Sequence, residues 1–217
     1  MSSQPPTTIL LIRHGQTDWN LQGRWQGHTD IPLNSAGLAQ ARALAERLAG
    51  WPIEVIHASD LSRAAGTARI LAQSTGAPVT VDACWRERHC GAFEGLTLAE
   101  IRERFPEHHA RMQLGWMDPP GAEDFEVVRA RLTAALDRLR EEHRGHMAAV
   151  VSHGGALATL IAHVLGLGRE ARHRVALDGN TGLSILEDRG RGLRLALLND
   201  TAHLEGAGLG GDLPLKV

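Results

Sequence analysis

Short apolar runs alternate along the chain with longer segments of helical periodicity. The run Ile9–Ile12 is continuous, partly β-branched, and stops at a polar triplet that contains glycine, which is typical of a buried strand in a parallel sheet. The same character recurs in three further runs, Ile53–Ala58, Val79–Val81 and Ala148–Ser152. Two later segments that alternate apolar and polar residues predict the strands that close the sheet: Leu183–Leu186 and Leu193–Leu198.

Helices are predicted between these strands. From Asn34 or Ser35 onward, apolar residues recur at steps of three and four, and Gly50 follows the last of them, so a capped helix is expected there. A long amphipathic helix is expected after Gly121, because apolar residues repeat with the same steps up to Leu139. Two more helices are expected, from Arg63 to about Gln73 and from near Gly154 to about Leu165.

The order of these elements predicts an α/β fold. Strands that alternate with helices indicate an open, mostly parallel sheet with helices on both faces, and such sheets bind ligands beyond the carboxyl ends of their strands. No repeat, low-complexity block or linker divides the chain, so we expect residues 1–217 to form a single domain. Prolines break a polar stretch into short pieces, which predicts a small helical insertion, or lid, over residues 96–121. The glycine-rich tail, residues 206–217, is expected to be loose.

Composition and charge exclude several classes of protein. The 217 residues are 43% hydrophobic and 22% charged, as in an ordinary globular protein. Lys and Arg number 23 against 25 Asp and Glu, so there is no global positive field to attract nucleic acid or a membrane surface. Cys84 and Cys90 have no second pair of cysteines to complete a zinc site, and we expect them to be free thiols.

The N-terminal residues do not predict an export signal. No basic segment precedes the four apolar residues that end before Arg13, and no run approaches the roughly 20 apolar residues of a membrane-spanning helix. We therefore expect a cytoplasmic protein without a membrane partner.

Three polar clusters follow predicted strands directly. They are Arg13-His14-Gly15, the segment Ser59–Arg63, and Ser152-His153-Gly154. A mostly parallel sheet would bring all three to one edge, where they supply two guanidinium groups, two imidazoles and two helix starts. A guanidinium matches phosphate oxygens in shape, and a helix N-terminus adds backbone donors and a favourable dipole. The sequence therefore predicts a site for a phosphoryl group.

At these clusters the sequence resembles the histidine phosphatase superfamily, also called phosphoglycerate mutase-like. The segment Arg13–Asn20 matches the family's RHGxTxWN signature, and Gln26–Leu33 is similar to its QGxxDxPL stretch. Four more motifs follow in family order: Ser59–Ala68 (SxLxRAxxTA), Glu87–Thr97 (E…GxxEGLT), Gly121–Phe125 (GGESF) and Ser152–Gly155 (SHGG). The resemblance runs from about Ile9 to His203. Within the family it favours the phosphatases, being similar to broad-specificity and α-ribazole phosphatases.

The resemblance implies a metal-independent phosphatase that acts on small phosphate monoesters and needs no cofactor. His14 would attack phosphorus and become phosphohistidine. Glu87 would protonate the leaving group and then activate water, and His153 is the third catalytic residue. The expected phosphate- and substrate-binding residues are Arg13, Asn20, Gln26, Gly27, Arg63 and Gly154. No HExxH motif or matching carboxylate cluster accompanies the other histidines, so no metal site is expected.

Several alternatives stay open at this point. Glu94 lies in the same predicted loop region as Glu87 and competes with it for the acid–base role. Arg86–Gly91 resembles the ERHYG motif of phosphoglycerate mutases, so a cofactor-dependent mutase is the first rival. A catalytically silent module that binds phosphate ligands is the second. The sequence does not define the phosphate ester, nor whether the protein forms a homodimer.

Overall fold

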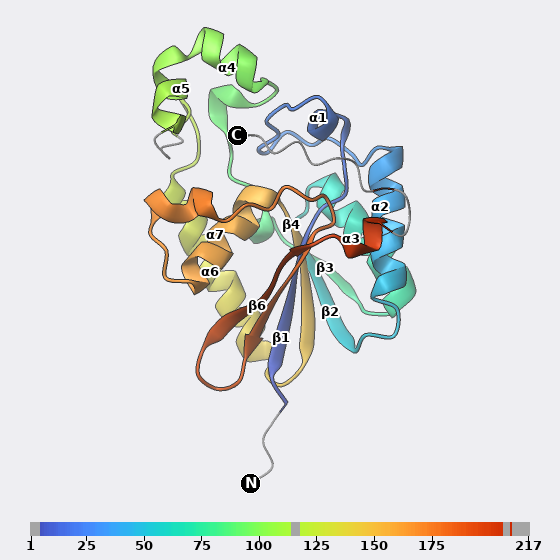
Figure 1. Cartoon of the computed structure of the whole chain (residues 1–217). Coiled ribbons are helices and arrows are strands. Elements are labelled where there is room, and N and C mark those ends of the chain that lie inside the picture. Colours follow the sequence, from blue (N-terminus) through green and yellow to red (C-terminus); the bar gives the residue numbers. More distant parts are fainter. Residues whose placement is uncertain (1–4, 114–117, 206–208, 210–217) are drawn as a thin grey trace.

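A six-stranded sheet forms the centre of the molecule (Figure 1). The computed structural model describes residues 5–113, 118–205 and 209. The strands lie in the order β3-β2-β4-β1-β5-β6. The first four are parallel, β5 pairs antiparallel with β1, and β6 pairs antiparallel with β5. The bounds are β1 Thr7–Arg13, β2 Ile53–Ala58, β3 Val79–Val81, β4 Met147–Ser152, β5 Leu183–Asp188 and β6 Leu193–Asp200.

The described helices connect and cover these strands. The expected α/β fold, with a mostly parallel sheet, is confirmed. The bounds of the helices are α1 Asp18–Leu21, α2 Ser35–Arg47, α3 Ser62–Thr75, α4 Leu98–Arg104, α5 Pro106–Gln113, α6 Phe125–Glu142, α7 Gly154–Val164 and α8 Ala202–Glu205. Short 3-10 helices lie at Ala83–Trp85, Gly91–Phe93 and Arg169–Arg174.

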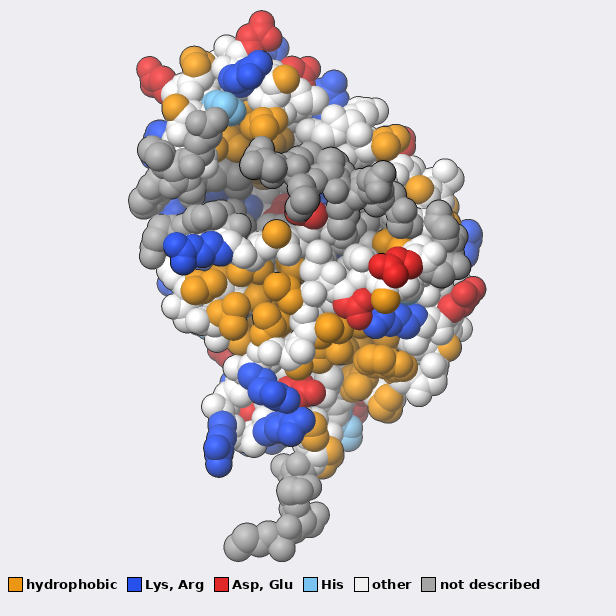
Figure 2. All heavy atoms as spheres, viewed as in Figure 1, with side chains coloured by type: hydrophobic (Ala, Val, Ile, Leu, Met, Phe, Trp, Pro, Cys, Tyr) orange, Lys and Arg blue, Asp and Glu red, His pale blue; other side chains and the backbone are white. Residues whose placement is uncertain are grey.

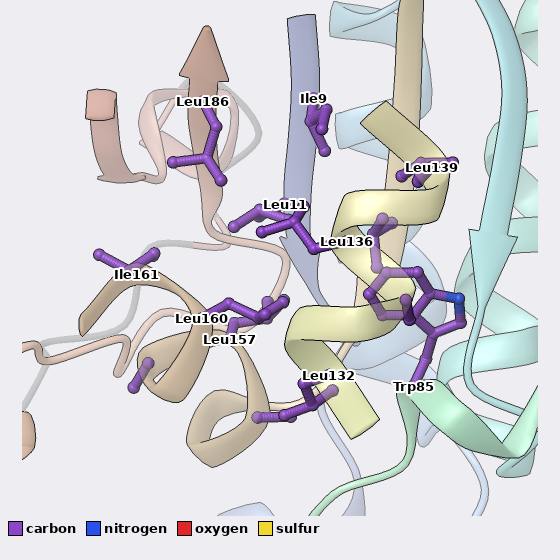
Figure 3. Close-up of a cluster of buried hydrophobic side chains, with 14 of the residues drawn as sticks. Ile9, Leu11, Trp85, Leu132, Leu136, Leu139, Leu157, Leu160, Ile161 and Leu186 are labelled. Carbon is purple, nitrogen blue, oxygen red and sulfur yellow. The ribbon is translucent and has the colours of Figure 1, made fainter. Parts of the chain in front are cut away.

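Alternate residues of the strands face two separate hydrophobic clusters. In β1, Ile9 and Leu11 pack with α6 and α7 on one face, whereas Leu10 and Ile12 pack with α2 and α3 on the other. All four side chains are fully buried. Figure 3 shows the first cluster, in which leucines of α6 and α7 meet Ile9, Leu11 and Trp85. A continuous apolar run is therefore what a strand covered on both faces requires.

The polar middle of the chain forms the expected helical insertion. Helices α4 and α5 lie at the top of Figure 1, above α6 and α7 and away from the sheet. A small third cluster supports this segment, in which Cys90, Phe93 and Ile101 are buried. Thr97 and Glu100 form a capping box at the start of α4. The expectation of a loose tail concerns residues 206–217, which apart from Leu209 lie outside the described residues.

The strand register brings the three polar clusters to one edge of the sheet. Arg13 at the end of β1 is level with Ser152 at the end of β4, and Ala58 of β2 is level with Val151. The backbone N–H of His14 donates to the carbonyl of Ser152 at 2.9 Å. The residues that follow these strands therefore meet beyond the carboxyl edge.

Exposed cationic side chains gather far from that edge. Figure 2 shows Lys and Arg side chains at the bottom of the view, where Figure 1 places the turn between β5 and β6. Three exposed arginines belong to this hairpin, Arg189, Arg191 and Arg194. Among the described residues, no helix is both long and apolar enough to cross a membrane.

Candidate active site

His14 lies at the end of β1 and is 3% exposed. Its Nδ1 lies 2.7 Å from the carbonyl oxygen of Gly15. A carbonyl only accepts, so Nδ1 must donate its proton. Burial, with the charges of Arg63 and Arg13, holds the pKa of His14 well below its ordinary value of 6.5. The ring is therefore neutral, and its Nε2 has a free electron pair that can act as a nucleophile.

Gly15, which follows His14, and Gly37 of α2 allow the loop after β1 to pack closely against this helix. A Cβ on Gly15 would lie 2.5 Å from the carbonyl oxygen of Gly37, and a Cβ on Gly37 would lie 2.1 Å from the carbonyl oxygen of Gln16. The N–H of Gly15 also donates to Thr67 Oγ1 of α3 at 3.1 Å. The position of His14 is thus fixed by contacts from both helices on this face.

His153 lies at the N-cap of α7, with its ring 5.2 Å from that of His14, centroid to centroid. Its Nδ1 accepts a hydrogen bond from Nε of Arg63 at 3.2 Å. In the neutral ring, the proton must then be on Nε2. Burial and the charge of Arg63 hold the pKa of His153 well below its ordinary value. Nε2 is buried and has no hydrogen-bond partner among the described residues, so it offers a donor to a ligand.

Arg63 is fully buried at the start of α3. Besides its bond to His153, it donates from Nη1 to the carbonyl of Thr29 at 2.9 Å and from Nη2 to the carbonyl of Gly27 at 2.8 Å. Each Nη atom has a second N–H that remains for a ligand. Burial lowers the pKa of Arg63 to about 10, so the guanidinium is still charged at neutral pH.

Arg13 is anchored by the loop that precedes β5. Its Nη1 donates to the carbonyls of Leu177 and Asp178 at 2.8 and 2.6 Å. Its Nε is buried without a hydrogen-bond partner in the part of the chain that the structure describes. That atom lies 3.5 Å from the place where a Cβ on Gly154 would be. The guanidinium of Arg13 therefore lies against the N-terminus of α7, where the helix dipole favours an anion.

Glu87 reaches the same helix N-terminus. Its Oε2 accepts the N–H of Gly155 at 2.9 Å, and its Oε1 accepts the N–H of Arg88 at 2.9 Å. A Cβ on Gly155 would lie 2.7 Å from Oε1, so glycine at this position lets the carboxylate approach. The geometry places a carboxylate at the N-terminus of α7, where its charge acts on Arg13 and Arg63.

Glu94, the competing carboxylate, joins the loop at His28 and Thr29 to its own loop at Cys90 by hydrogen bonds. It accepts hydrogen bonds from the N–H groups of His28, Thr29 and Cys90 and from the Thr29 hydroxyl, at 2.6 to 3.0 Å. Burial raises its pKa, but these donors lower it below the ordinary value overall. Among the described residues, each oxygen of Glu94 thus accepts two hydrogen bonds, whereas each oxygen of Glu87 accepts one.

The remaining predicted residues lie in the segment between β1 and α2, which includes α1. Gly27 has a φ of +52°, and a Cβ there would lie 2.1 Å from Oε1 of Glu94; its carbonyl orients Arg63. Gln26 is buried, and its Oε1 has no partner among the described residues. Asn20 is at the third position of α1, where its Oδ1 accepts from the N–H and hydroxyl of Thr17. The structure thus gives Gly27 a supporting position, and among the described residues Gln26 makes no hydrogen bond to His14 or His153.

Sequence reasoning did not find two residues that support this site. His28 donates from Nε2 to the carbonyl of Glu87 at 2.8 Å, and Asn180 donates to the carbonyl of His14 at 3.1 Å. His28 lies inside the segment Gln26–Leu33, so it could have been singled out there. Within the described part of the chain, no three His, Cys, Asp or Glu side chains cluster in a way that could bind a metal ion, and both cysteines are free.

Low histidine pKa values predict a pH-dependent stability. In the folded protein His14 and His153 bind protons only well below pH 6.5, and His203 only near pH 4, because burial disfavours their charged forms. In the unfolded chain they bind protons near pH 6.5. The free energy of unfolding should be fully retained above pH 6.5 and should fall as the pH is lowered below it. Urea unfolding across this range measures the effect.

The control separates these histidines from exposed ones. Replacing exposed His163 with glutamine should leave the slope of stability against pH unchanged, whereas His153→Gln should reduce it. A slope that is the same in both variants would show that the buried histidines do not cause it.

Comparison with known proteins identifies the family of the chain. A model of the histidine phosphatase superfamily (branch 1) matches residues 9–201. The chain is 34% identical over 215 residues to phosphoglycerate mutase-like protein 4 of Arabidopsis thaliana, covering 94% of this chain and 92% of that protein. It is 37% identical over 163 residues to the metal-independent phosphoserine phosphatase of the same plant, covering 73% and 68%.

A solved structure shares the fold. That of a putative α-ribazole-5'-P phosphatase from Escherichia coli K-12 superposes with a TM-score of 0.80 and 28% identity, covering 90% of this chain and 97% of that one. The resemblance seen in the motifs is therefore confirmed along nearly the whole chain. The protein belongs to the histidine phosphatase superfamily, branch 1.

Proposed function

We propose that this protein hydrolyses small phosphate monoesters without a metal ion, through a phosphohistidine at His14. Its family and relatives support a phosphoric monoester hydrolase. The observation that carries the proposal is a pair of buried donors beside a neutral imidazole. Nε of Arg13 and Nε2 of His153 have no hydrogen-bond partner among the described residues, and buried polar groups normally have one. Phosphate oxygens would supply the missing acceptors.

The first step transfers the phosphoryl group to the enzyme. Nε2 of His14 attacks phosphorus while the bond from phosphorus to the ester oxygen breaks. Glu87 gives its proton to the leaving oxygen. Arg13, Arg63 and His153 stabilise the charge on the three equatorial oxygens, which is the main catalytic contribution in phosphoryl transfer.

The second step returns the enzyme to its starting state. Glu87, now ionised, takes a proton from water, and the oxygen of that water attacks the phosphohistidine. The bond from nitrogen to phosphorus breaks, inorganic phosphate leaves, and the electron pair returns to Nε2 of His14. Asn20 and the N-terminus of α7 at Gly154 contribute uncharged donors. Gln26 and Gly27 belong to the loop that faces the substrate, in which Gly27 orients Arg63.

The proposed function also includes the domain organisation of the protein, its partners and its location in the cell. The insertion that contains α4 and α5 would act as a lid of one domain comprising residues 1–217. A small organic phosphate is the partner, and nucleic acid is not, in keeping with the formal charge of −2. We place the protein in the cytoplasm, since both cysteines are free thiols. Size measurement in solution would decide between a monomer and a homodimer.

Hydrolysis, rather than transfer within the substrate, is expected to dominate. Some relatives carry mutase names, among them phosphoglycerate mutase-like protein 4 and the probable phosphoglycerate mutase GpmB of Salmonella choleraesuis. A mutase must hold its product alcohol and exclude water until the phosphoryl group returns. Glu87 accepts the N–H of Gly155 at the N-terminus of α7, and we expect it to activate water there. With a panel of metabolite phosphates, the enzyme should release inorganic phosphate without a bisphosphorylated primer, and equally well with a chelator present.

Two outcomes would contradict this expectation. Interconversion of 3- and 2-phosphoglycerate that outpaces phosphate release, and that is stimulated by 2,3-bisphosphoglycerate, would support the mutase. Loss of activity with chelator that a divalent ion restores would exclude the metal-independent mechanism. A protein that binds orthophosphate but turns over no ester would instead be the silent binding module.

A further inference from the structure

A loop on the far side of β1 reaches the catalytic edge. Because β5 runs antiparallel to β1, with Leu183 level with Ile12, the residues that precede β5 lie beside those that follow β1. Arg13 donates from its backbone N–H to the carbonyl of Gly182 at 3.2 Å. The side chain of Arg13 is bonded to carbonyls at the start of the same loop.

This loop, residues 178–182, is held in one conformation by close contacts. A Cβ on Gly179 would lie 2.5 Å from Cγ2 of Thr201, and a Cβ on Gly182 would lie 2.3 Å from Oδ1 of Asn199. Thr181 is fully buried with a φ of +56°, which an L-residue adopts only under constraint from its surroundings. Its hydroxyl lies 2.9 Å from Nε2 of His203.

Asn180 projects from this loop onto two residues of the site. Its Nδ2 donates to the carbonyl of His14 at 3.1 Å and lies 3.4 Å from Oδ1 of Asn20. The carbonyl of His14 also accepts the N–H of Thr181 at 3.3 Å. A carbonyl can only accept, so the amide of Asn180 is oriented with its nitrogen toward His14.

The same contact adds a third donor to the two from Thr17 that orient the amide of Asn20. Oδ1 of Asn20 faces three donors, the N–H and hydroxyl of Thr17 and Nδ2 of Asn180. The NH₂ group must then point to the opposite side, where it can donate to a ligand. Without Asn180, the oxygen of Asn20 loses one of these donors, and His14 loses a support of its backbone.

We propose that Asn180 is a positioning residue, which fixes the backbone of the nucleophile His14 and turns the NH₂ group of Asn20 toward the phosphoryl group. The inference rests on the proposed function of His14 and Asn20. Asn180 acts through these neighbours and does not itself bind the phosphate.

A double-mutant cycle with Asn20 tests the inference. Asn180→Ala should lower kcat for 4-nitrophenyl phosphate by about 10- to 100-fold, the usual scale of a misplaced catalytic group, and should change KM much less. In an Asn20→Ala background the same substitution should cost much less. Asn180→Asp keeps the volume but loses the donor, so it should resemble Asn180→Ala. Ala176→Ser, an exposed change in the preceding segment, is the matched control with unchanged kcat.

Binding of orthovanadate, measured by calorimetry, separates this inference from the proposed function. Asn180→Ala and Asn180→Asp should bind it more weakly than the parent protein, while thermal unfolding shows that both are folded. Unchanged kcat and vanadate affinity would overturn the inference, as would an equal loss of kcat in the presence and absence of Asn20. If the parent binds vanadate but hydrolyses no ester, the hydrolase proposal fails and the binding comparison still tests Asn180. Should Asn180→Ala not fold, Asn180→Asp provides the same comparison.

Discussion

Replacing His14 with alanine is expected to reduce turnover by about 10⁴-fold or more, the scale on which removal of a nucleophile acts in enzymes with a covalent intermediate. The neutral ring and the free Nε2 derive from one hydrogen bond and from burial, and no described neighbour offers a replacement in the same position. Steady-state release of inorganic phosphate measures the loss.

Folding should survive this substitution. His14 lies at the end of a strand, outside the two large hydrophobic clusters, so thermal unfolding should show a cooperative transition close to that of the parent protein. His163→Ala, which changes an exposed histidine of α7, is the matched control and should be fully active. More than a few per cent of activity in His14→Ala would remove this residue from the role of nucleophile.

Replacing Arg63 with alanine should have the second largest effect. The loss of one preorganised group that stabilises the transition state costs about 2–4 kcal/mol, which is about 30- to 1000-fold in kcat/KM. Arg63→Ala also leaves the carbonyls of Gly27 and Thr29 and Nδ1 of His153 without their donor. Each unsatisfied buried group costs about 1–3 kcal/mol of stability, so the unfolding temperature should fall as well.

Two further variants separate charge from shape at this position. Arg63→Lys retains the charge but lacks the planar fork that serves three acceptors, so it should recover only part of the lost activity. Arg42→Ala, on the exposed side of α2, should change neither kcat/KM nor stability. If Arg63→Lys were as active and as stable as the parent protein, the three directed hydrogen bonds would have no role.

The sequence predicts the bounds of several strands to within one residue, because each is a short apolar run with a clear polar boundary. The observed bounds of β2 and β3 are the predicted ones, and β4 begins one residue earlier than expected, at Met147. Each of these strands is short and lies between a helix and a polar loop. The meeting of Arg13, Arg63 and His153 at one edge was predictable as well, since parallel strands deliver their carboxyl ends to the same side.

The helix α1 was not predictable from periodicity. It has four residues, too few for an apolar repeat, and it is stabilised by a capping box between Thr17 and Asn20. The usual partner at this position of the box is Glu or Gln, so the pattern does not stand out. This helix nevertheless decides which atom of Asn20 can reach a ligand.

The roles of Glu94 and Asn180 depend on long-range geometry that the sequence does not contain. Glu94 and Glu87 are both acidic residues of one loop region, and only their hydrogen bonds distinguish the carboxylate that joins two loops from the one proposed as the acid–base group. Asn180 lies next to His14 because β5 runs antiparallel to β1. An alternating segment near the end of a chain predicts a strand but not its direction.

The central claim is that phosphate passes through a covalent bond to Nε2 of His14, and trapping that intermediate tests it most directly. The enzyme is mixed with a phosphorylated substrate and quenched in alkali, because phosphohistidine is labile in acid, and mass spectrometry of its peptides then locates the phosphoryl group. The mechanism predicts one phosphorylated peptide that contains His14, formed as fast as the leaving group is released and absent from His14→Ala. A phosphoryl group on another residue, or substrate consumption by His14→Ala at the rate of the parent protein, would contradict it.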